Sequence, residues 1–162
     1  DELSELALKA EPGSNGMTTI PFFEGERTPN LPNSKGSIHG VTLSSFTAPN
    51  LARSVIEGML CGLQFGLGRL QQAGIPAQRL LLIGGSAQNA AVQQIAATVF
   101  DVPIEVPKIS EYVAEGAAVQ AAWVLTGERP NWQVETTARI APNVSQALLD
   151  NYRDALSSYV KM

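Results

Sequence analysis

The segment that most constrains the fold runs from Arg79 to Ala91 and reads R-L-L-L-I-G-G-S-A-Q-N-A-A. Its apolar residues Leu80 to Ile83 predict a strand that is buried on both faces. The pair Gly84-Gly85 follows, and the stretch from Gln88 to Phe100 predicts a helix. A strand, a glycine turn and a helix start bring backbone N–H groups to one point, where an anion or a nucleotide can approach closely. The alternative is that the two glycines only turn the chain from a strand into a helix.

The rest of the chain alternates β-prone and helical segments. The β-prone runs are Met17 to Phe23, Leu80 to Ile83 and Val102 to Val106, with a fourth candidate from Gly40 to Leu43. The helical patterns cover Asp1 to Ala10, Pro49 to Gly74, Gln88 to Phe100, Glu111 to Thr126 and Ser145 to Met162. This order predicts the α/β class, with a parallel sheet and helices packed on its faces. Because such sheets commonly hold about five or six strands, we expect part of the sheet to be missing.

Two stretches lack a regular pattern. The stretch from Glu24 to Gly40 is rich in Gly, Pro and Asn, and it predicts a long loop of the kind that is usually functional or mobile. The stretch from Asn131 to Asn143 is expected to be an irregular connection. The first residue is Asp rather than Met, and we expect the chain to be a piece of a longer protein.

The long helix from Pro49 to Gly74 carries glycines at every fourth position, Gly58, Gly62 and Gly66. Because each internal glycine costs a helix about 0.5–1 kcal/mol relative to alanine, the stripe predicts that another backbone or a ligand lies very close. Tight packing is the favoured reason. Glu57 on this helix is either a residue at the rim or a buried, hydrogen-bonding acid, and Cys61 is interpreted as a small core residue.

Composition excludes several classes of protein. The net charge is −4 and the basic residues are scattered, which argues against a nucleic-acid or anionic-membrane surface. No run of apolar residues is long enough for a membrane span, and the acidic N-terminal segment does not resemble a signal peptide. A single cysteine and a single histidine exclude a disulfide framework and a structural zinc site. We therefore expect a cytoplasmic protein.

The sequence contains no complete set of catalytic residues. The single histidine, His39, lies in the long loop without a nucleophile pattern around it, and it is interpreted as solvated or structural. Arg27 and Lys35 in the same loop could meet a phosphate or could be ordinary solvated charges. The carboxylates at 24, 26, 111 and 115 are not spaced as an acid–base pair. We therefore assign no catalytic residue and no metal ligand.

Four motifs resemble a known family. Residues Pro21 to Pro29, P-F-F-E-G-E-R-T-P, resemble the Pro-Tyr-Leu-x-Gly-Glu-Arg-Thr-Pro segment of xylulokinases. Leu51 to Gly58 resembles the helix that follows that segment in those enzymes, and Ile83 to Asn89 resembles their adenosine motif. Glu115 to Leu125 resembles their later Ala-Leu-Gly-Ala-Ala helix. The motifs occur in the family's order over most of the chain, which thus resembles the C-terminal lobe of an FGGY-family carbohydrate kinase.

The resemblance implies a ribonuclease-H-like (actin-like ATPase) lobe that carries the ATP side of a two-lobed cleft and here lacks its first β-hairpin. Residues 1–162 would form this domain, with 1–16 as a leading helix and linker and 144–162 as the terminal helix. By motif position, the turn against the adenosine would consist of Gly84, Gly85, Ser86 and Ala87, and Asn89 would approach the adenine. Two residues depart from the motifs: Ser86 replaces a third glycine, and Gln120 replaces the glycine of the later helix.

The resemblance also implies the activity of the intact protein. That protein would use ATP and Mg²⁺ to phosphorylate the 5-hydroxyl of D-xylulose. The catalytic Asp, the sugar pocket and a Gly-Thr-Ser-Gly phosphate turn belong to parts of these kinases that are not found in this sequence. We therefore expect the isolated chain to be inactive without its N-terminal sugar-binding lobe, and its uncovered surface could also pair with a second copy. The alternatives are a non-catalytic actin-like interaction module and a family member acting on another sugar or polyol.

Overall fold

The computed structural model describes residues 2–160, so that Asp1, Lys161 and Met162 at the ends of the first and last expected helices lie outside the described residues. The helices are α1 (Glu2–Ala7), α2 (Ala48–Gln72), α3 (Ala90–Val99), α4 (Tyr112–Thr126) and α5 (Gln146–Ser157), with 3₁₀ turns η1 (Ser14–Gly16) and η2 (Gly85–Gln88). The strands are β1 (Thr18–Ile20), β2 (Ser37–His39), β3 (Leu80–Leu81), β4 (Ile104–Pro107) and β5 (Thr136–Ile140). All five expected helices are confirmed, although α1 and α5 are shorter than their patterns.

The strands form two small sheets. β1 and β2 pair antiparallel, while β3, β4 and β5 form a three-stranded sheet with β4 in the centre. β3 runs parallel to β4, but β5 runs antiparallel to it. The prediction of a parallel sheet is thus right for β3 and β4 and wrong for the other pairs.

Three predictions about strands and loops need correction. β2 lies inside the expected loop of residues 24–40, and β5 lies inside the expected irregular connection of residues 131–143. Both strands depend on a partner strand, since neither has a long apolar run of its own. Residues 40–43 form no strand, because Thr42 and Ser45 accept hydrogen bonds from each other's backbone N–H and close a turn.

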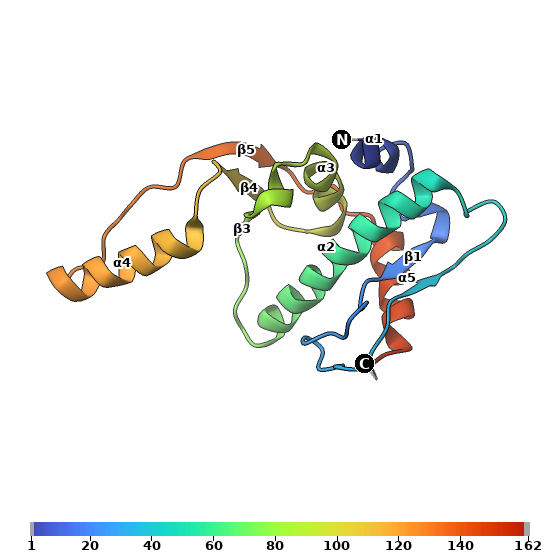
Figure 1. Cartoon of the computed structure of the whole chain (residues 1–162), viewed down its shortest axis with the longest axis horizontal. Helices are drawn as coiled ribbons and strands as arrows, with labels where there is room; N and C mark the ends of the chain where they lie inside the picture. The colour runs from blue at the N-terminus through green and yellow to red at the C-terminus, as the bar shows by residue number, and fades with distance from the viewer. Residues whose placement is uncertain (1, 161–162) are drawn as a thin grey trace.

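The core is built around α2. This helix contacts α1, α3, α5 and β1, and it crosses the middle of the molecule in Figure 1. Thr47 caps its first turn by accepting a hydrogen bond from the Asn50 N–H. The side chains that fill the core come from these elements and from β4; they include Ile20, Ile56, Leu60, Ile95, Val99, Ile104 and Leu156.

The glycine stripe of α2 is explained at one position. A Cβ on Gly58 would overlap the carbonyl oxygen of Thr19 in β1, so this glycine lets a strand backbone lie against the helix. A Cβ on Gly62 would lie 3.5 Å from the Tyr152 hydroxyl, an ordinary contact, and one on Gly66 would meet nothing within 4 Å. The predicted close approach is confirmed for Gly58 and is wrong for Gly66.

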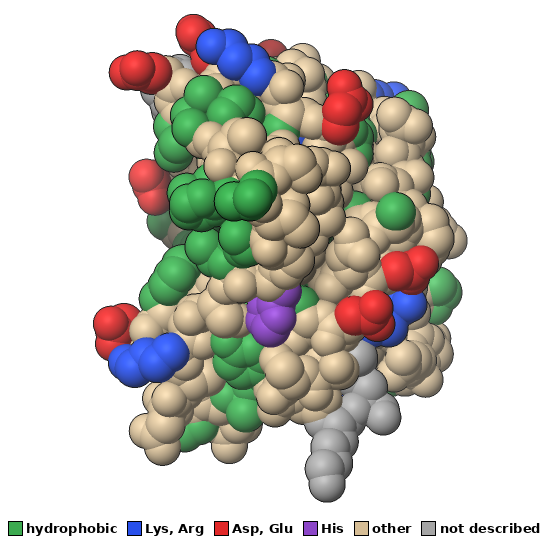
Figure 2. Space-filling model, turned by 90° about the vertical axis from the view of Figure 1, so that its right-hand side faces the viewer, with side chains coloured by type: hydrophobic (Ala, Val, Ile, Leu, Met, Phe, Trp, Pro, Cys, Tyr) green, Lys and Arg blue, Asp and Glu red, His purple; other side chains and the backbone are tan. Residues whose placement is uncertain are grey.

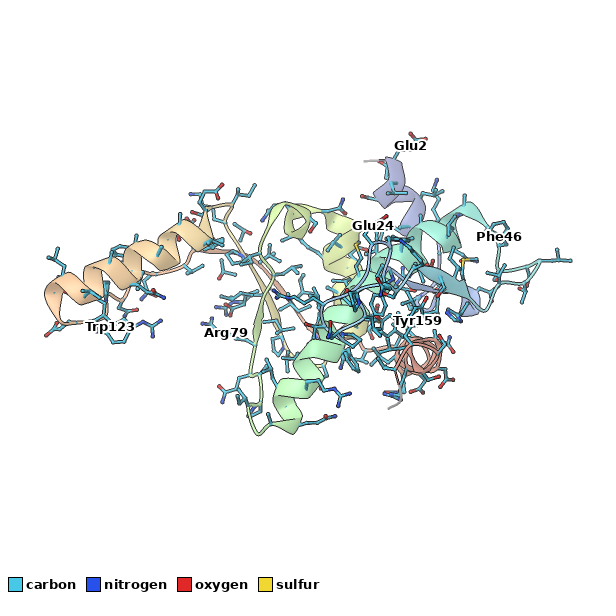
Figure 3. All side chains as sticks on the ribbon, turned by 60° about the horizontal axis from the view of Figure 1, so that its bottom comes forward. Glu2, Glu24, Phe46, Arg79, Trp123 and Tyr159 are labelled. Carbon is cyan, nitrogen blue, oxygen red and sulfur yellow. The ribbon has the colours of Figure 1, made fainter. Side chains whose placement is uncertain are left out.

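One side of the three-stranded sheet is uncovered. β3 was expected to be buried on both faces, yet Leu81 is 44% exposed and Ile83 just after it is 49% exposed. The helices were expected to pack on the faces of the sheet, but no residue of the alanine-rich helix α4 is buried, and Val124 is 88% exposed. Figure 1 shows α4 extending away from the core, and Figure 3 places Trp123 of α4 and Phe46 at opposite ends of the molecule. No element of the described chain covers these apolar side chains.

Among residues 2–160, no helix combines the length and the apolar composition that crossing a membrane requires.

Candidate functional site

The strand–glycine–helix segment forms a turn at the carboxyl ends of the parallel strands β3 and β4. Gly84 has φ +98°, a backbone conformation that favours glycine, and the turn η2 begins at Gly85. Gly84, Gly85 and Ser86 are exposed, whereas Ala87 is buried beneath them. A Cβ on Gly84 or Gly85 would meet nothing within 4 Å, so the space in front of the turn is open. In α/β sheets, ligands bind outside the carboxyl ends of strands, which makes this turn the candidate site.

Hydrogen bonds and an ion pair fasten the turn to its surroundings. The Gln93 side chain donates to the Ala87 carbonyl at 2.8 Å, and the Gln88 side chain donates to the Pro107 carbonyl of β4 at 3.2 Å. At the other end of β3, the Arg79 guanidinium lies 2.7 Å from the carboxylate of Glu105 in β4. The turn is therefore open to a ligand but anchored on both sides.

Asn89 ends the turn and caps α3. Its Oδ1 accepts hydrogen bonds from the N–H groups of Ala91 at 2.9 Å and Val92 at 3.3 Å. Its Nδ2 donates to the hydroxyl of Ser4 in α1 at 2.6 Å. Sequence reasoning missed Ser4, because the two residues lie 85 positions apart and no local pattern joins them.

The polar residues of the long loop make mainly local contacts. Glu26 Oε1 accepts from the N–H groups of Arg27 and Thr28, and the Lys35 ammonium lies 3.6 Å from Glu24. The His39 Nε2 forms a hydrogen bond of 2.8 Å with the Ser37 hydroxyl. Figure 2 shows the single histidine (purple) at the surface, bordered by apolar and uncharged atoms.

The acidic side chains show whether any residues are arranged to bind a metal ion. Glu115 accepts a hydrogen bond from the Ser110 hydroxyl, and Glu111 precedes α4 without capping it by its side chain. Within residues 2–160, no three His, Cys, Asp or Glu side chains come together as metal ligands.

Glu57 is a buried acid, which decides between the two alternatives that its sequence position left open. Its carboxylate accepts hydrogen bonds from the Arg53 Nε at 2.6 Å, the Gly13 N–H at 2.9 Å and the Ser14 hydroxyl at 2.9 Å. Arg53 also donates to the Ala10 carbonyl at 3.0 Å. Since these bonds tie residues 10–14 to α2 and involve no residue of the turn, Glu57 has a structural role.

Cys61 and Tyr152 lie buried next to this network. Burial, with the Glu57 carboxylate as a second cause, raises the pKa of the Cys61 thiol, which keeps the thiol neutral at pH 7. Cys61 is therefore a core residue, as predicted. Burial also raises the pKa of the Tyr152 hydroxyl, with smaller contributions from Cys61 and Glu26.

A separate groove lies between residues 21–29, the second half of α2 and α5. Its volume is about 490 Å³, and its walls are apolar apart from Glu26, Thr28 and the Tyr152 hydroxyl. None of the residues 84–89 lines it. Phe23, Met59 and Leu63 in its walls are exposed, so the groove adds to the uncovered apolar surface of the chain.

The described residues thus supply a candidate ligand-binding turn without a reactive group beside it. A flat or compact ligand group can approach the backbone of the turn closely, because its glycines have no side chains. It contains no general acid, base or nucleophile apart from the Ser86 hydroxyl. The geometry is that of an open surface, since no described residue occupies the space in front of the two glycines.

Comparison with known proteins identifies the family to which this chain belongs. The profile described as "FGGY family of carbohydrate kinases, C-terminal domain" matches residues 1–125. The xylulose kinase of Haemophilus influenzae is 37% identical over 99% of this chain and 33% of that protein, and the xylulose kinase of Streptomyces rubiginosus is 43% identical over 74% of this chain and 25% of that protein.

A solved structure shows the same arrangement of elements. The crystal structure of xylulose kinase from Bifidobacterium adolescentis superimposes with a TM-score of 0.85 and 41% identity, over 96% of this chain and 31% of that one. The chain therefore spans between a quarter and a third of the length of these relatives.

Proposed function

Since this chain belongs to the FGGY family of carbohydrate kinases and matches its C-terminal domain, we propose that it is the ATP-side domain of an enzyme that phosphorylates D-xylulose to D-xylulose 5-phosphate. The observation that carries this proposal is the identity of about 40% with xylulose kinases over nearly the whole chain. The Gly25-Glu26-Arg27-Thr28-Pro29 motif supports the sugar assignment. We place the intact enzyme in the cytoplasm, where ATP is available.

The turn from Gly84 to Asn89 fits the adenosine end of ATP. Its open glycines allow a nucleoside to approach the backbone, and it lies at the carboxyl ends of β3 and β4. We propose that Gly84, Gly85, Ser86 and Ala87 form the surface against the adenosine. ATP would supply the phosphoryl group, while these residues bind and orient its nucleoside. Among the described residues, no cluster of side chains could hold Mg²⁺.

This chain covers about a third of the length of these relatives, and we propose that the remainder contains the N-terminal sugar-binding lobe. We propose that preceding residues, including the first β-hairpin of the ATP-side lobe itself, lie along the free edge of β3 and under α4. The exposed Leu81 and Ile83 and the unburied α4 support this arrangement, because an apolar helix and an open sheet edge favour a covering partner.

The test of the proposed function compares two proteins. The chain joined to its upstream sequence is expected to form ADP from ATP only when D-xylulose is present. The isolated 162-residue chain is expected to form none, because phosphoryl transfer depends on groups positioned on both sides of the donor. ADP release is measured by a coupled assay with D-xylulose, D-ribulose, glycerol and gluconate as separate substrates.

Each outcome separates the candidate functions. Activity with D-xylulose alone supports the proposal. A preference for another sugar or polyol would show that the intact enzyme is a family member with a different substrate. An intact protein that binds no ATP and phosphorylates none of these substrates would instead be a non-catalytic actin-like module. Sugar-dependent ADP release by the isolated chain would contradict the need for a second lobe.

The adenosine surface is tested by Gly85→Val. The fold should tolerate the new side chain, because a Cβ at this position meets nothing within 4 Å, but the side chain would occupy the space proposed for the nucleoside. We expect the KM for ATP of the intact enzyme to rise at least about tenfold, which corresponds to about 1.4 kcal/mol. Gly68→Val on α2 is the matched control, since a Cβ there also meets nothing within 4 Å. Equal KM values for the two variants would place the nucleoside elsewhere.

A further inference from the structure

The side-chain amide of Asn89 is held at three of its four hydrogen-bonding positions. An asparagine amide offers two acceptor lone pairs and two N–H donors. Both lone pairs of Oδ1 are used by the N–H groups of Ala91 and Val92, and this fixes which end of the amide faces α3. One N–H of Nδ2 goes to Ser4 at 2.6 Å. Among residues 2–160 the amide has no further partner, so one N–H of Nδ2 remains beyond these bonds.

Ser4 is well placed to hold this amide. Its residue is 8% exposed, and its helix α1 packs against both α2 and α3. Because α1 is fixed by those contacts, the Ser4 hydroxyl does not have to be ordered when a ligand arrives. The hydrogen bond between Asn89 and Ser4 therefore ties the end of the candidate nucleotide turn to α1.

We propose that Ser4 is a positioning residue of the nucleotide site. It holds the Asn89 amide in one orientation, so that the remaining N–H can donate to a ring nitrogen of a bound purine. The proposal rests on the assignment of the Gly84–Asn89 turn to adenosine. Ser4 itself does not touch the nucleotide in this arrangement.

The consequence of removing the Ser4 hydroxyl follows from the remaining bonds. In Ser4→Ala the α3 N–H groups still hold Oδ1, but Nδ2 loses its fixed partner. The amide must then be ordered when the base binds, and this ordering reduces affinity for the nucleotide. A single neutral hydrogen bond of this kind corresponds to about a three- to tenfold change in binding.

The experiment measures steady-state kinetics and ATP binding by calorimetry on the intact enzyme. We expect Ser4→Ala to raise the KM and Kd for ATP about three- to tenfold, with kcat and the KM for D-xylulose unchanged. Ser4→Thr retains a hydroxyl at this position and should restore both constants to within about twofold of wild type. The matched control is Ser54→Ala, which removes another buried hydroxyl, bonded to Thr19 at 2.8 Å, and should leave the ATP constants unchanged.

Asn89→Asp tests the donated N–H separately from the fold. The carboxylate can still accept from the α3 N–H groups and from the Ser4 hydroxyl, so the melting temperature should hold. It lacks the amide N–H, so the KM for ATP should rise at least as much as in Ser4→Ala. A KM for ATP that stays at the wild-type value in Asn89→Asp would overturn the donor role of Asn89.

The outcomes distinguish this inference from the proposed function. If the enzyme phosphorylates D-xylulose but Ser4→Ala leaves the ATP constants unchanged, or Ser54→Ala raises them equally, the inference is wrong and the function stands. If the intact protein binds ATP in a Ser4-dependent way without acting on D-xylulose, the inference stands and the function is wrong. If it binds no ATP, both are overturned.

Discussion

Replacing Glu57 by alanine is expected to lower the free energy of unfolding by about 3–5 kcal/mol. The substitution leaves the Arg53 guanidinium buried without its carboxylate, and it removes the acceptor of the Gly13 N–H and the Ser14 hydroxyl. Glu57 is 4% exposed and Arg53 is 5% exposed, so water does not replace the lost partner. Urea denaturation of the isolated chain or the intact enzyme, followed by circular dichroism, measures the change.

The control for Glu57→Ala is Asp150→Ala, which breaks the exposed pair between Asp150 and Arg153 at 2.9 Å. Exposed pairs contribute about 0–1 kcal/mol, so this variant should unfold close to wild type. Glu57→Gln is expected to fall between the two, because the amide retains one acceptor oxygen but carries no charge. Equal destabilisation by Glu57→Ala and Asp150→Ala would show that the buried network contributes little to stability.

Gly58→Ala is expected to destabilise the chain by about 3 kcal/mol. A Cβ at this position would overlap the Thr19 carbonyl oxygen, and this obstacle is backbone rather than a side chain that can rotate away. β1 would have to move off α2, and the hydrogen bond of 2.8 Å between Thr19 and Ser54 would be strained or lost. Thermal unfolding measures the effect as a fall in the melting temperature.

Gly66→Ala is the matched control, since it makes the same chemical change on the same stripe of the same helix. A Cβ there meets nothing within 4 Å, and alanine favours a helix over glycine by about 0.5–1 kcal/mol. We therefore expect Gly66→Ala to be neutral or slightly stabilising. If both substitutions destabilise α2 to the same degree, the close approach of β1 is not the reason for Gly58.

The helices and the turn could be predicted from local sequence. Thr47 and Pro49 mark the start of α2, and the apolar run followed by Gly84-Gly85 marks the turn between β3 and α3. Capping, glycine conformation and helical periodicity act over a few residues, so their signals stand within a short stretch of sequence. The candidate turn was identified for the same reason.

The short strands could not be predicted in this way. β2 has three residues and β5 has five, and each is a strand because β1 or β4 supplies its hydrogen-bonding partner. The predicted burial of β3 was wrong because burial depends on what lies across the sheet. In the described chain, no element packs across the sheet from Leu81 and Ile83, and both side chains are exposed.

The sequence by itself determined the family, the helices and the position of the glycine turn, because short-range patterns and motif order record them. Only the tertiary structure decided which distant residues serve that turn. The Ser4 hydroxyl reaches Asn89 across 85 residues, and Glu57 binds residues 43 and 44 positions before it. Such contacts depend on how helices pack against one another. The order of residues along the chain does not give the distances between α1, α2 and α3 in space. The physical reason is that a hydrogen bond depends on separation in space, while the sequence records only separation along the chain.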